Sequence, residues 1–260
     1  QKLVSPFILR RTKKQVLKDL PDKVEKDMWL NFSPEEKQLY LANLAQVNEQ
    51  LQQQLELEQV DSILIIAMMT RLRQICCEPR MLYENYKGES TKFTMCLELI
   101  ETLKENGKKV LLFSSFTSIF DSFIEEFNQR GIKYHMITGA VDKKKRKEEV
   151  DAFQSDDSDV FLISLKAGGT GLNLTKAQAV IHYDPWWNVS AQNQATDRAY
   201  RIGQTKNVLV YQLLMKNTIE AKIYEMQKRK KEMSDIFVEN SNGGISTLSK
   251  EELRDLFSME

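Results

Sequence analysis

Two arginines and a glutamine lie close together in the stretch from Gln194 to Arg201, and their side chains suit one kind of chemistry. If this stretch is helical, then at about 100° per residue Gln194, Arg198 and Arg201 fall within roughly a 60° arc of one helix face. Guanidinium is permanently charged and presents a planar fork of donors, which suits it to phosphate. A single arginine would usually pair with a surface acid, here Asp184 or Asp197, but two on one face favour anion binding.

A glycine-rich loop, Gly168-Gly169-Thr170-Gly171, follows the most apolar stretch of the sequence, Asp159–Ser164. Glycines there allow backbone N–H groups to approach a phosphate or a carboxylate closely. The loop lacks the Gly-x-x-x-x-Gly-Lys-Ser/Thr pattern, so it is not a Walker A loop. A tight structural turn is an equally good interpretation of the same residues.

The sequence contains no hydrolase triad, no nucleophile elbow and no metal-ligand spacing. His135 and His182 fall on separate predicted strands without a carboxylate or cysteine pattern beside them, so both are interpreted as structural. Three cysteines, two of them adjacent at Cys76 and Cys77, favour a reducing location inside the cell. That location is the cytoplasm or nucleoid of a bacterium or the nucleus of a eukaryote. No signal peptide or membrane-spanning run is present, so no membrane partner is expected.

The elements that would position these residues follow from the hydrophobic pattern. From Lys92 onward, short apolar stretches alternate with amphipathic ones, which predicts a parallel sheet covered by helices on both faces. Right-handed crossovers would place every strand-to-helix loop at one edge of that sheet. The predicted strands are Val110–Phe113, Tyr134–Ile137, Asp159–Ser164, Ala179–Tyr183 and Val208–Leu214, and the predicted helices are Phe93–Glu105, Ser118–Arg130, Lys143–Phe153, Ser190–Arg201 and Ile219–Met233.

The flanks of this alternating region are mostly helical in pattern. Ser33-Pro34-Glu35-Glu36 predicts a helix start, with serine as N-cap and acids in the first turn. Ile63–Met69 begins a more buried helix that ends near Glu78, and Lys23–Asn31 is a short strand or an extended connector. Asn240–Gly244 is a flexible joint before a short capped helix from Ser249.

Charge and aromatic residues add two features at the predicted edge. Net charge is +0, yet Lys143–Lys147 is a strongly basic run. Such a run is most often a solvated helix face, but at this edge it could follow a nucleic-acid backbone. Of Trp186 and Trp187, one is expected in the core and the other as a stacking platform or interface anchor. Asp184 could be a lone carboxylate at this edge that serves only as a turn cap.

Taken together these motifs resemble the second RecA-like lobe of Swi/Snf-type DNA translocases in helicase superfamily two. The resemblance covers nearly the whole chain, and Asp184–Asn188 with Gln194–Gln204 is its most specific part, resembling motif VI. Lys109–Thr117 resembles motif IV and Ile163–Leu174 resembles motif V. Leu72–Cys76 with Pro79 and Leu82 resembles the helical region between the lobes, with Glu78 where histidine is usual, and Pro6–Lys13 resembles the segment that leaves the first lobe.

The resemblance implies an α/β fold, RecA-like, with a mostly parallel sheet, helices on both faces, an N-terminal helical subdomain and a C-terminal helical brace. Residues 1–90 would be the helical inter-lobe linker or protrusion, 91–216 the second RecA-like lobe, and 217–260 the C-terminal helix and brace. The chain begins without methionine inside a patterned segment, so it is expected to be a fragment of a longer protein.

The resemblance also implies a split active site for ATP with magnesium. A first lobe of the same polypeptide would hold both, through a Walker A lysine and an acid pair that this sequence does not contain. Arg198 and Arg201 would act as arginine fingers, worth about 10³–10⁵ in rate, and Gln194 would orient water or phosphate. The implied cofactor-binding residues are Gly169, Thr170, Gly171 and Asp197.

Double-stranded DNA is the implied partner at the same edge. The residues implied to bind it are Ser114, Phe116, Thr117, Thr138, Gly139, Lys166, Ala167, Gly168, Asn173 and Trp186. The family usually has Asp-Gly-Ser where this chain has Ile137-Thr-Gly-Ala140, so the hydroxyl contact differs there. A different class of function is also open: a module that docks a nucleic acid, RNA polymerase or another DNA-bound protein without motor activity. The isolated chain is expected to be inactive.

Overall fold

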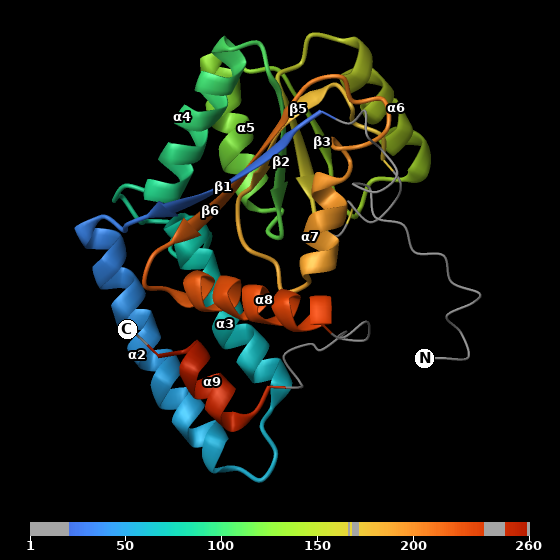
Figure 1. Cartoon of the computed structure of the whole chain (residues 1–260). Coiled ribbons are helices and arrows are strands. Elements are labelled where there is room, and N and C mark those ends of the chain that lie inside the picture. Colours follow the sequence, from blue (N-terminus) through green and yellow to red (C-terminus); the bar gives the residue numbers. More distant parts are fainter. Residues whose placement is uncertain (1–20, 166, 168–171, 237–247, 259–260) are drawn as a thin grey trace, which may run out of the picture.

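A parallel sheet of six strands runs through the centre of the molecule (Figure 1). The computed structural model describes residues 21–165, 167, 172–236 and 248–258. Neighbouring strands are parallel throughout the order β1-β6-β5-β2-β4-β3, so all their carboxyl ends lie along one edge, as predicted. The strands are β1 (Lys23–Leu30), β2 (Lys109–Ser114), β3 (Tyr134–Ile137), β4 (Val160–Ser164), β5 (Ala177–His182) and β6 (Val208–Met215).

The strand order reverses around β2, which lies between β4 and β5. The chain builds β2, β3 and β4 on one side and then crosses to β5 and β6 on the other. The loop after β2 leads toward β3 and the loop after the adjacent strand β5 leads toward β6. These two loops therefore diverge, which is where open α/β sheets bind their ligands. This places the loops after Ser114, Ser164 and His182 at the position expected for a site.

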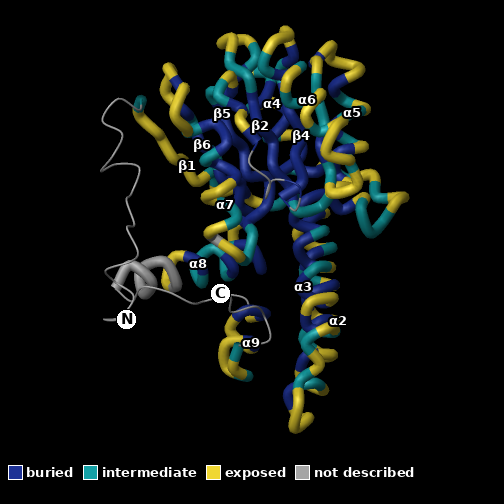
Figure 2. Tube along the Cα trace, turned by 90° about the vertical axis from the view of Figure 1, so that its right-hand side faces the viewer, coloured by how far each residue is buried: buried dark blue, intermediate teal, exposed yellow. Residues whose placement is uncertain are grey.

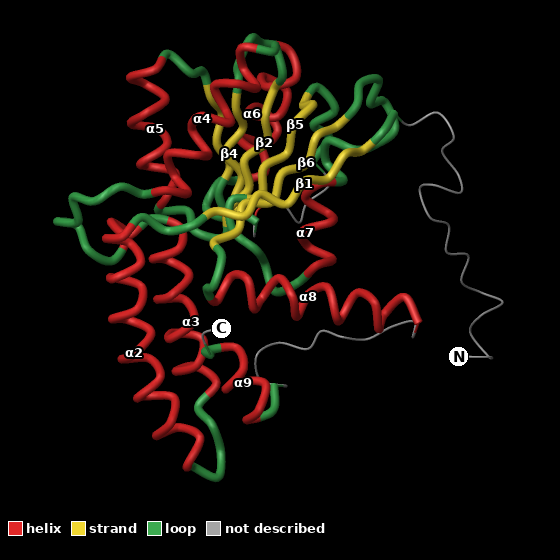
Figure 3. The backbone as a smooth tube through the Cα atoms, turned by 60° about the vertical axis from the view of Figure 1, so that its left-hand side comes forward, coloured by secondary structure: helices red, strands yellow, loops and turns green. Residues whose placement is uncertain are grey.

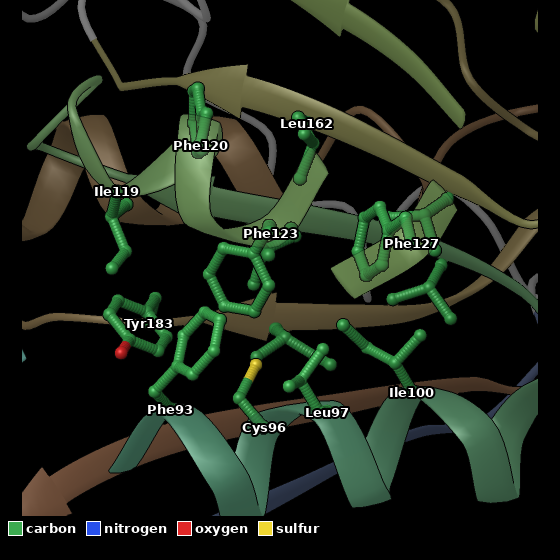
Figure 4. Close-up of a cluster of buried hydrophobic side chains, with 14 of the residues drawn as sticks. Phe93, Cys96, Leu97, Ile100, Ile119, Phe120, Phe123, Phe127, Leu162 and Tyr183 are labelled. Atoms are coloured by element: carbon green, nitrogen blue, oxygen red, sulfur yellow. The ribbon is translucent and has the colours of Figure 1, made fainter. Parts of the chain in front are cut away.

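Helices cover both faces of the sheet, which confirms the predicted α/β architecture. One face packs against α4 (Thr91–Glu105) and α5 (Ile119–Arg130), and the other against α6 (Lys143–Ser155) and α7 (Val189–Thr196). Figure 4 shows the first of these cores, in which Phe93 of α4 meets Phe123 of α5 with ring centroids 4.7 Å apart. Alternate residues of β2 serve the two faces, since Leu112 enters one core and Leu111 the other.

A helical hairpin extends from the carboxyl edge of the sheet (Figure 3). It consists of α2 (Pro34–Glu56) and α3 (Ser62–Cys77), and a short 3-10 helix (Pro79–Met81) follows it. Ser33 caps α2, as predicted, and its side chain also forms a capping box with Glu36. The apolar side of the hairpin packs against α8 (Ile219–Ile236) and α9 (Lys250–Leu256) in a separate core that includes Leu51, Leu72 and Ile223.

The segment before this hairpin belongs to the sheet. Lys23–Leu30 is a strand rather than a connector, and it pairs with β6 along its whole length. Figure 2 shows the central strands buried and β1 exposed at the sheet edge. Among the described helices, none is long and apolar enough to cross a membrane. The predictions for Pro6–Lys13 and Asn240–Gly244 fall outside the described residues.

Candidate functional site

A buried carboxylate, Asp184, lies at the carboxyl edge of the sheet just after β5. Its Oδ1 accepts hydrogen bonds from the Ser114 hydroxyl at 2.7 Å and the Ser115 backbone N–H at 2.9 Å. Its Oδ2 accepts from Arg73 Nη2 at 2.7 Å and from the Ser115 hydroxyl. The side chain is 0% exposed, and these donors compensate for its burial. Asp184 is therefore an anchor between segments, which corrects the expectation of a simple turn cap.

Arg73 of α3 is the second member of this polar cluster, and sequence reasoning missed it. Its Nη2 also donates to Ser115 Oγ at 2.8 Å and to the Pro185 carbonyl at 3.2 Å. The guanidinium carbon lies 5.0 Å from the centre of the Phe116 ring and 5.8 Å from that of Trp186. The available signal was a charged residue between apolar positions of a buried helix, because such a charge needs a partner.

The segment with Arg198 and Arg201 is not one helix, and this corrects the predicted helix Ser190–Arg201. Helix α7 spans Val189–Thr196, with Asn188 rather than Ser190 as N-cap and Asp197 as C-cap. Turns follow, so the shared helix face calculated from the sequence does not exist. The backbone of this segment instead forms hydrogen bonds with other parts of the chain. The Arg198 carbonyl accepts a hydrogen bond from the Leu174 N–H at 3.1 Å. The Gln204 side chain donates to the Ala199 carbonyl at 3.1 Å.

The three predicted catalytic side chains still lie on one segment and differ in exposure. Gln194 and Arg201 are exposed, whereas Arg198 is 8% exposed. Burial lowers the pKa of the Arg198 guanidinium, and the nearby charge of Arg201 lowers it further, while Asp197 opposes the change. The two guanidinium groups therefore repel each other within a part-buried site. An anion bound beside them would relieve this repulsion.

The predicted loop residues differ in what the structure describes. Lys166, Gly168, Gly169, Thr170 and Gly171 lie outside the described residues. Ala167 is 3% exposed, and its backbone N–H donates to Ser164 Oγ at 3.3 Å. Asn173 is exposed.

The loops after β2 and β3 carry the remaining predicted DNA-binding residues. Ser114 is 0% exposed and its hydroxyl faces Asp184, whereas Thr117 is exposed and Phe116 is half-buried. Thr138 is half-buried and Gly139 is exposed, with open space where a side chain would lie. Helix α6 begins shortly after Gly139, and its first three residues and Lys147 are exposed lysines.

Both tryptophans of the aromatic turn take part in packing. Trp186 is half-buried against the core beneath α6 and α7, and its carbonyl accepts a hydrogen bond from Gln227 of α8. Trp187 is half-buried against the core of the hairpin and α8. The aromatic turn thus joins the sheet to the hairpin, with a tryptophan in each core.

The two histidines are bonded to protein groups. His182 lies 2.8 Å from Thr196 Oγ1 through Nε2, and burial lowers its pKa to about 4. His135 contacts the carboxylates of Glu149 and Asp156, each at 2.7 Å, which corrects the expectation that no carboxylate lies beside it. Within the described ranges, no group of three or more metal-ligating side chains is placed to bind a metal ion.

Comparisons with known proteins agree with this architecture. Residues 91–203 match the helicase conserved C-terminal domain, and residues 1–81 match the SNF2-related domain. The chain is similar to the Sulfolobus solfataricus SWI2/SNF2 ATPase core in complex with dsDNA, with a TM-score of 0.76 and 32% identity over 100% of this chain and 55% of that one. The C-terminal domain of the Sulfolobus ATPase gives a TM-score of 0.74 and 26% identity, over 92% of this chain and 100% of that domain.

A curated relative gives the same assignment by sequence. An uncharacterized ATP-dependent helicase of Mycoplasma pneumoniae is 40% identical over 258 residues, which are 97% of this chain and 24% of that protein. The chain therefore spans about a quarter of the length of this relative. Two domain matches, a shared parallel sheet and this identity agree: the chain belongs to the SNF2-related helicase family and has the fold of its C-terminal RecA-like lobe.

Proposed function

We propose that this chain is the second motor lobe of an ATP-dependent double-stranded-DNA translocase, and that it supplies Arg198 and Arg201 to ATP hydrolysis. The observation that carries the proposal is the placement of these two like charges. They are close enough for one to lower the pKa of the other, and one of them is buried. Such a pair is suited to a multiply charged anion such as a terminal phosphate.

The residues on this segment fit the phosphate end of ATP. Two guanidinium groups and the Gln194 amide offer donors to phosphate oxygens, and no residue here needs to transfer a proton. ATP with magnesium would supply the phosphoanhydride bond whose hydrolysis drives movement. Arg198 and Arg201 would neutralise charge that develops on the oxygens of the transferred group, and Gln194 would orient the attacking water. Asp197, at the end of α7, would tune the charge of Arg198.

The sequence contains no Walker A pattern, so this chain would hold only one side of the nucleotide. The other side, including magnesium, would belong to a first RecA-like lobe of the same polypeptide. Gly169, Thr170 and Gly171 are proposed to line the nucleotide from this side, as the motif resemblance implies. This division of the site makes the chain a partner in hydrolysis rather than a complete enzyme.

We propose that the loops at the carboxyl edge of the sheet form the surface that binds DNA. Thr117, Gly139 and Asn173 are exposed there, and the lysines at the start of α6 add positive charge. Small side chains and exposed backbone suit contact with a phosphate backbone, which fixes register without reading sequence. Ser114 and Trp186 would support the loops that form this DNA-binding surface. Thr138, Lys166, Ala167 and Gly168 would be its remaining residues. The family relative from Sulfolobus was solved with dsDNA, which supports this partner.

The test separates hydrolysis from DNA binding in the full-length protein. Arg198→Ala should lower DNA-stimulated ATPase activity by about 10³-fold, because a charge that stabilises the transition state is lost. Duplex affinity and its salt dependence should change little, because a finger residue does not neutralise DNA phosphates. The matched control is Lys147→Ala on α6, which should weaken duplex binding and reduce the salt slope.

The second candidate is a docking module without motor activity, and the exposed basic start of α6 is the feature that favours it. That candidate would be supported if full-length protein bound duplex DNA but hydrolysed no ATP. It would also be supported if Arg198→Ala and Lys147→Ala weakened DNA binding equally. Retained hydrolysis in Arg198→Ala would remove the finger assignment while leaving the family membership intact.

A further inference from the structure

Arg73 links its own helix to two segments that are far away in the sequence. It lies on α3 of the helical hairpin, and its Nη2 donates to Ser115, which follows β2, and to Asp184 and Pro185, which follow β5. The rings within 5.0 Å and 5.8 Å of its guanidinium belong to the next residues of the same two segments, Phe116 and Trp186. One side chain therefore joins the hairpin to two loops of the sheet edge.

Neighbouring Arg71 shows that this arrangement is specific to one position. Arg71 is on the same helix, but it is exposed, and its side-chain hydrogen bonds to described residues go to the hairpin and the segment after it. Its Nε donates to Asn43 at 2.7 Å, and its Nη2 lies 3.2 Å from the Tyr83 hydroxyl. Within the described part of the chain, Arg71 has no hydrogen bond to the loops of the sheet edge, and it serves as a matched control for Arg73.

The geometry of Arg73 is not the one that stability alone would favour. Its side chain is 7% exposed, and its buried Nε has no hydrogen-bond partner among the described residues. An unpaired buried donor destabilises the fold, and a buried ion pair is often no more stabilising than apolar residues of similar volume. The planar guanidinium fixes the orientation of the groups around it, because it forms hydrogen bonds in its plane and packs against aromatic rings on its faces.

The two loops that Arg73 joins belong to different parts of the proposed machine. The loop after β2 continues from Ser115 to Thr117, which is proposed to contact DNA. The segment after β5 continues from Asp184 through α7 to Arg198 and Arg201, which are proposed to contact phosphate. A shift of either loop relative to the other would separate DNA contact from the placement of the arginines. Misplacement by about 1 Å can cost about 10²-fold in rate.

We propose that Arg73 is a positioning residue that couples DNA contact to ATP hydrolysis by fixing the loop after β2 and the segment after β5 to one helix. This inference rests on the proposed function and goes beyond it by assigning the coupling to a residue of the hairpin. Asp184 is the shared acceptor through which both loops are held, and Ser115 donates to it twice.

The test uses the full-length protein with Arg73→Lys, which keeps the positive charge but loses the planar fork. ATP hydrolysis is measured with and without saturating duplex DNA, together with the DNA concentration for half-maximal stimulation and the duplex Kd. The expected result is that stimulation by DNA falls about 10- to 100-fold while the duplex Kd changes by less than about threefold. Arg71→Lys should match the wild type in both measurements.

A milder variant guards against loss of folding. Ser115→Ala removes one hydroxyl and keeps the backbone bond to Asp184, so stimulation should fall by about two- to fivefold with only a small fall in the thermal midpoint. Equal stimulation in Arg73→Lys and Arg71→Lys would overturn the inference. So would a parallel loss of stimulation, duplex affinity and thermal midpoint, which would make Arg73 merely structural. If wild-type protein showed no DNA-stimulated hydrolysis, the proposed function itself would fail, and the coupling role with it.

Discussion

The protonation of His182 affects the free energy of unfolding of the lobe. This residue is 2% exposed, and burial lowers its pKa to about 4 from an ordinary value of 6.5. The unfolded chain therefore binds a proton at higher pH than the folded chain does. The contribution of His182 to the free energy of unfolding is therefore fully present above pH 6.5 and is lost as the pH falls toward 4.

We expect His182→Gln to remove this part of the pH dependence. The difference between the two pKa values corresponds to about 3 kcal/mol, so wild type should lose about 2–3 kcal/mol more than the variant between pH 7 and pH 4. Urea unfolding at several pH values measures the difference. His135→Gln, which replaces the more exposed histidine, should retain the drop that His182 causes. Identical pH profiles for wild type and His182→Gln would contradict the assignment.

Single residues also show where sequence reasoning succeeds and where it stops. Arg198 and Arg201 could be proposed from the sequence because their type and spacing are local properties of the chain. Arg73 was missed because its significance depends on Asp184, which is 111 residues away in the sequence. No local pattern reports a contact of that range, so the polar cluster beneath the loops emerges only from the folded structure.

At the scale of elements, two helix starts share one carboxylate. Glu36 is 1% exposed in the first turn of α2, where it accepts from the Ser33 N–H at 2.9 Å. It also accepts from the Thr91 N–H at 2.9 Å and the Thr91 hydroxyl at 2.5 Å, at the start of α4. The capping box of α2 therefore ties the hairpin to a helix of the sheet.

Because Glu36 bonds to both helices, two substitutions in the same capping box should lower the free energy of unfolding by different amounts. Ser33→Ala should lower the free energy of unfolding by about 1 kcal/mol, because one cap bond is lost. Glu36→Ala should lower the free energy of unfolding by about 3 kcal/mol, because it leaves part-buried donors at the starts of both helices without an acceptor. Denaturant unfolding with a common m-value measures both. Equal costs would mean that the contact to Thr91 contributes nothing to stability.

Most elements were predicted from the sequence to within a few residues, since strands buried on both faces are apolar throughout. The end of α7 was not predicted correctly. Its sequence continues with good helix formers, yet the helix ends at Thr196 and the Arg198 carbonyl accepts a hydrogen bond from the Leu174 N–H. Helix propensity is a weak preference that such tertiary bonds override. The role of β1 was also left open, because its partner β6 lies far along the chain.

At the scale of the whole molecule, the chain would contact the bound nucleotide from one side only. We expect calorimetric titration of the isolated chain with magnesium and ATP to give a Kd above about 1 mM, since a micromolar affinity needs roughly twice the binding free energy of a millimolar one. Two arginines and an amide cannot supply it without the phosphate loop of the other lobe. Full-length protein should bind far more tightly in the same experiment. Sub-millimolar binding by the isolated chain would contradict the division of the site.

The pairing of β1 with β6 has a consequence for how the chain reaches its fold. Asp22, just before β1, bonds to Asn207, just before β6, across 185 residues. Closing a contact of such long range carries a loop entropy cost that must be met before the contact stabilises anything. During synthesis β1 leaves the ribosome before the other strands of this sheet, but its partner β6 emerges only after the other four. The edge of the sheet is therefore completed late, and until then Met28 and Leu30 remain available to wrong partners.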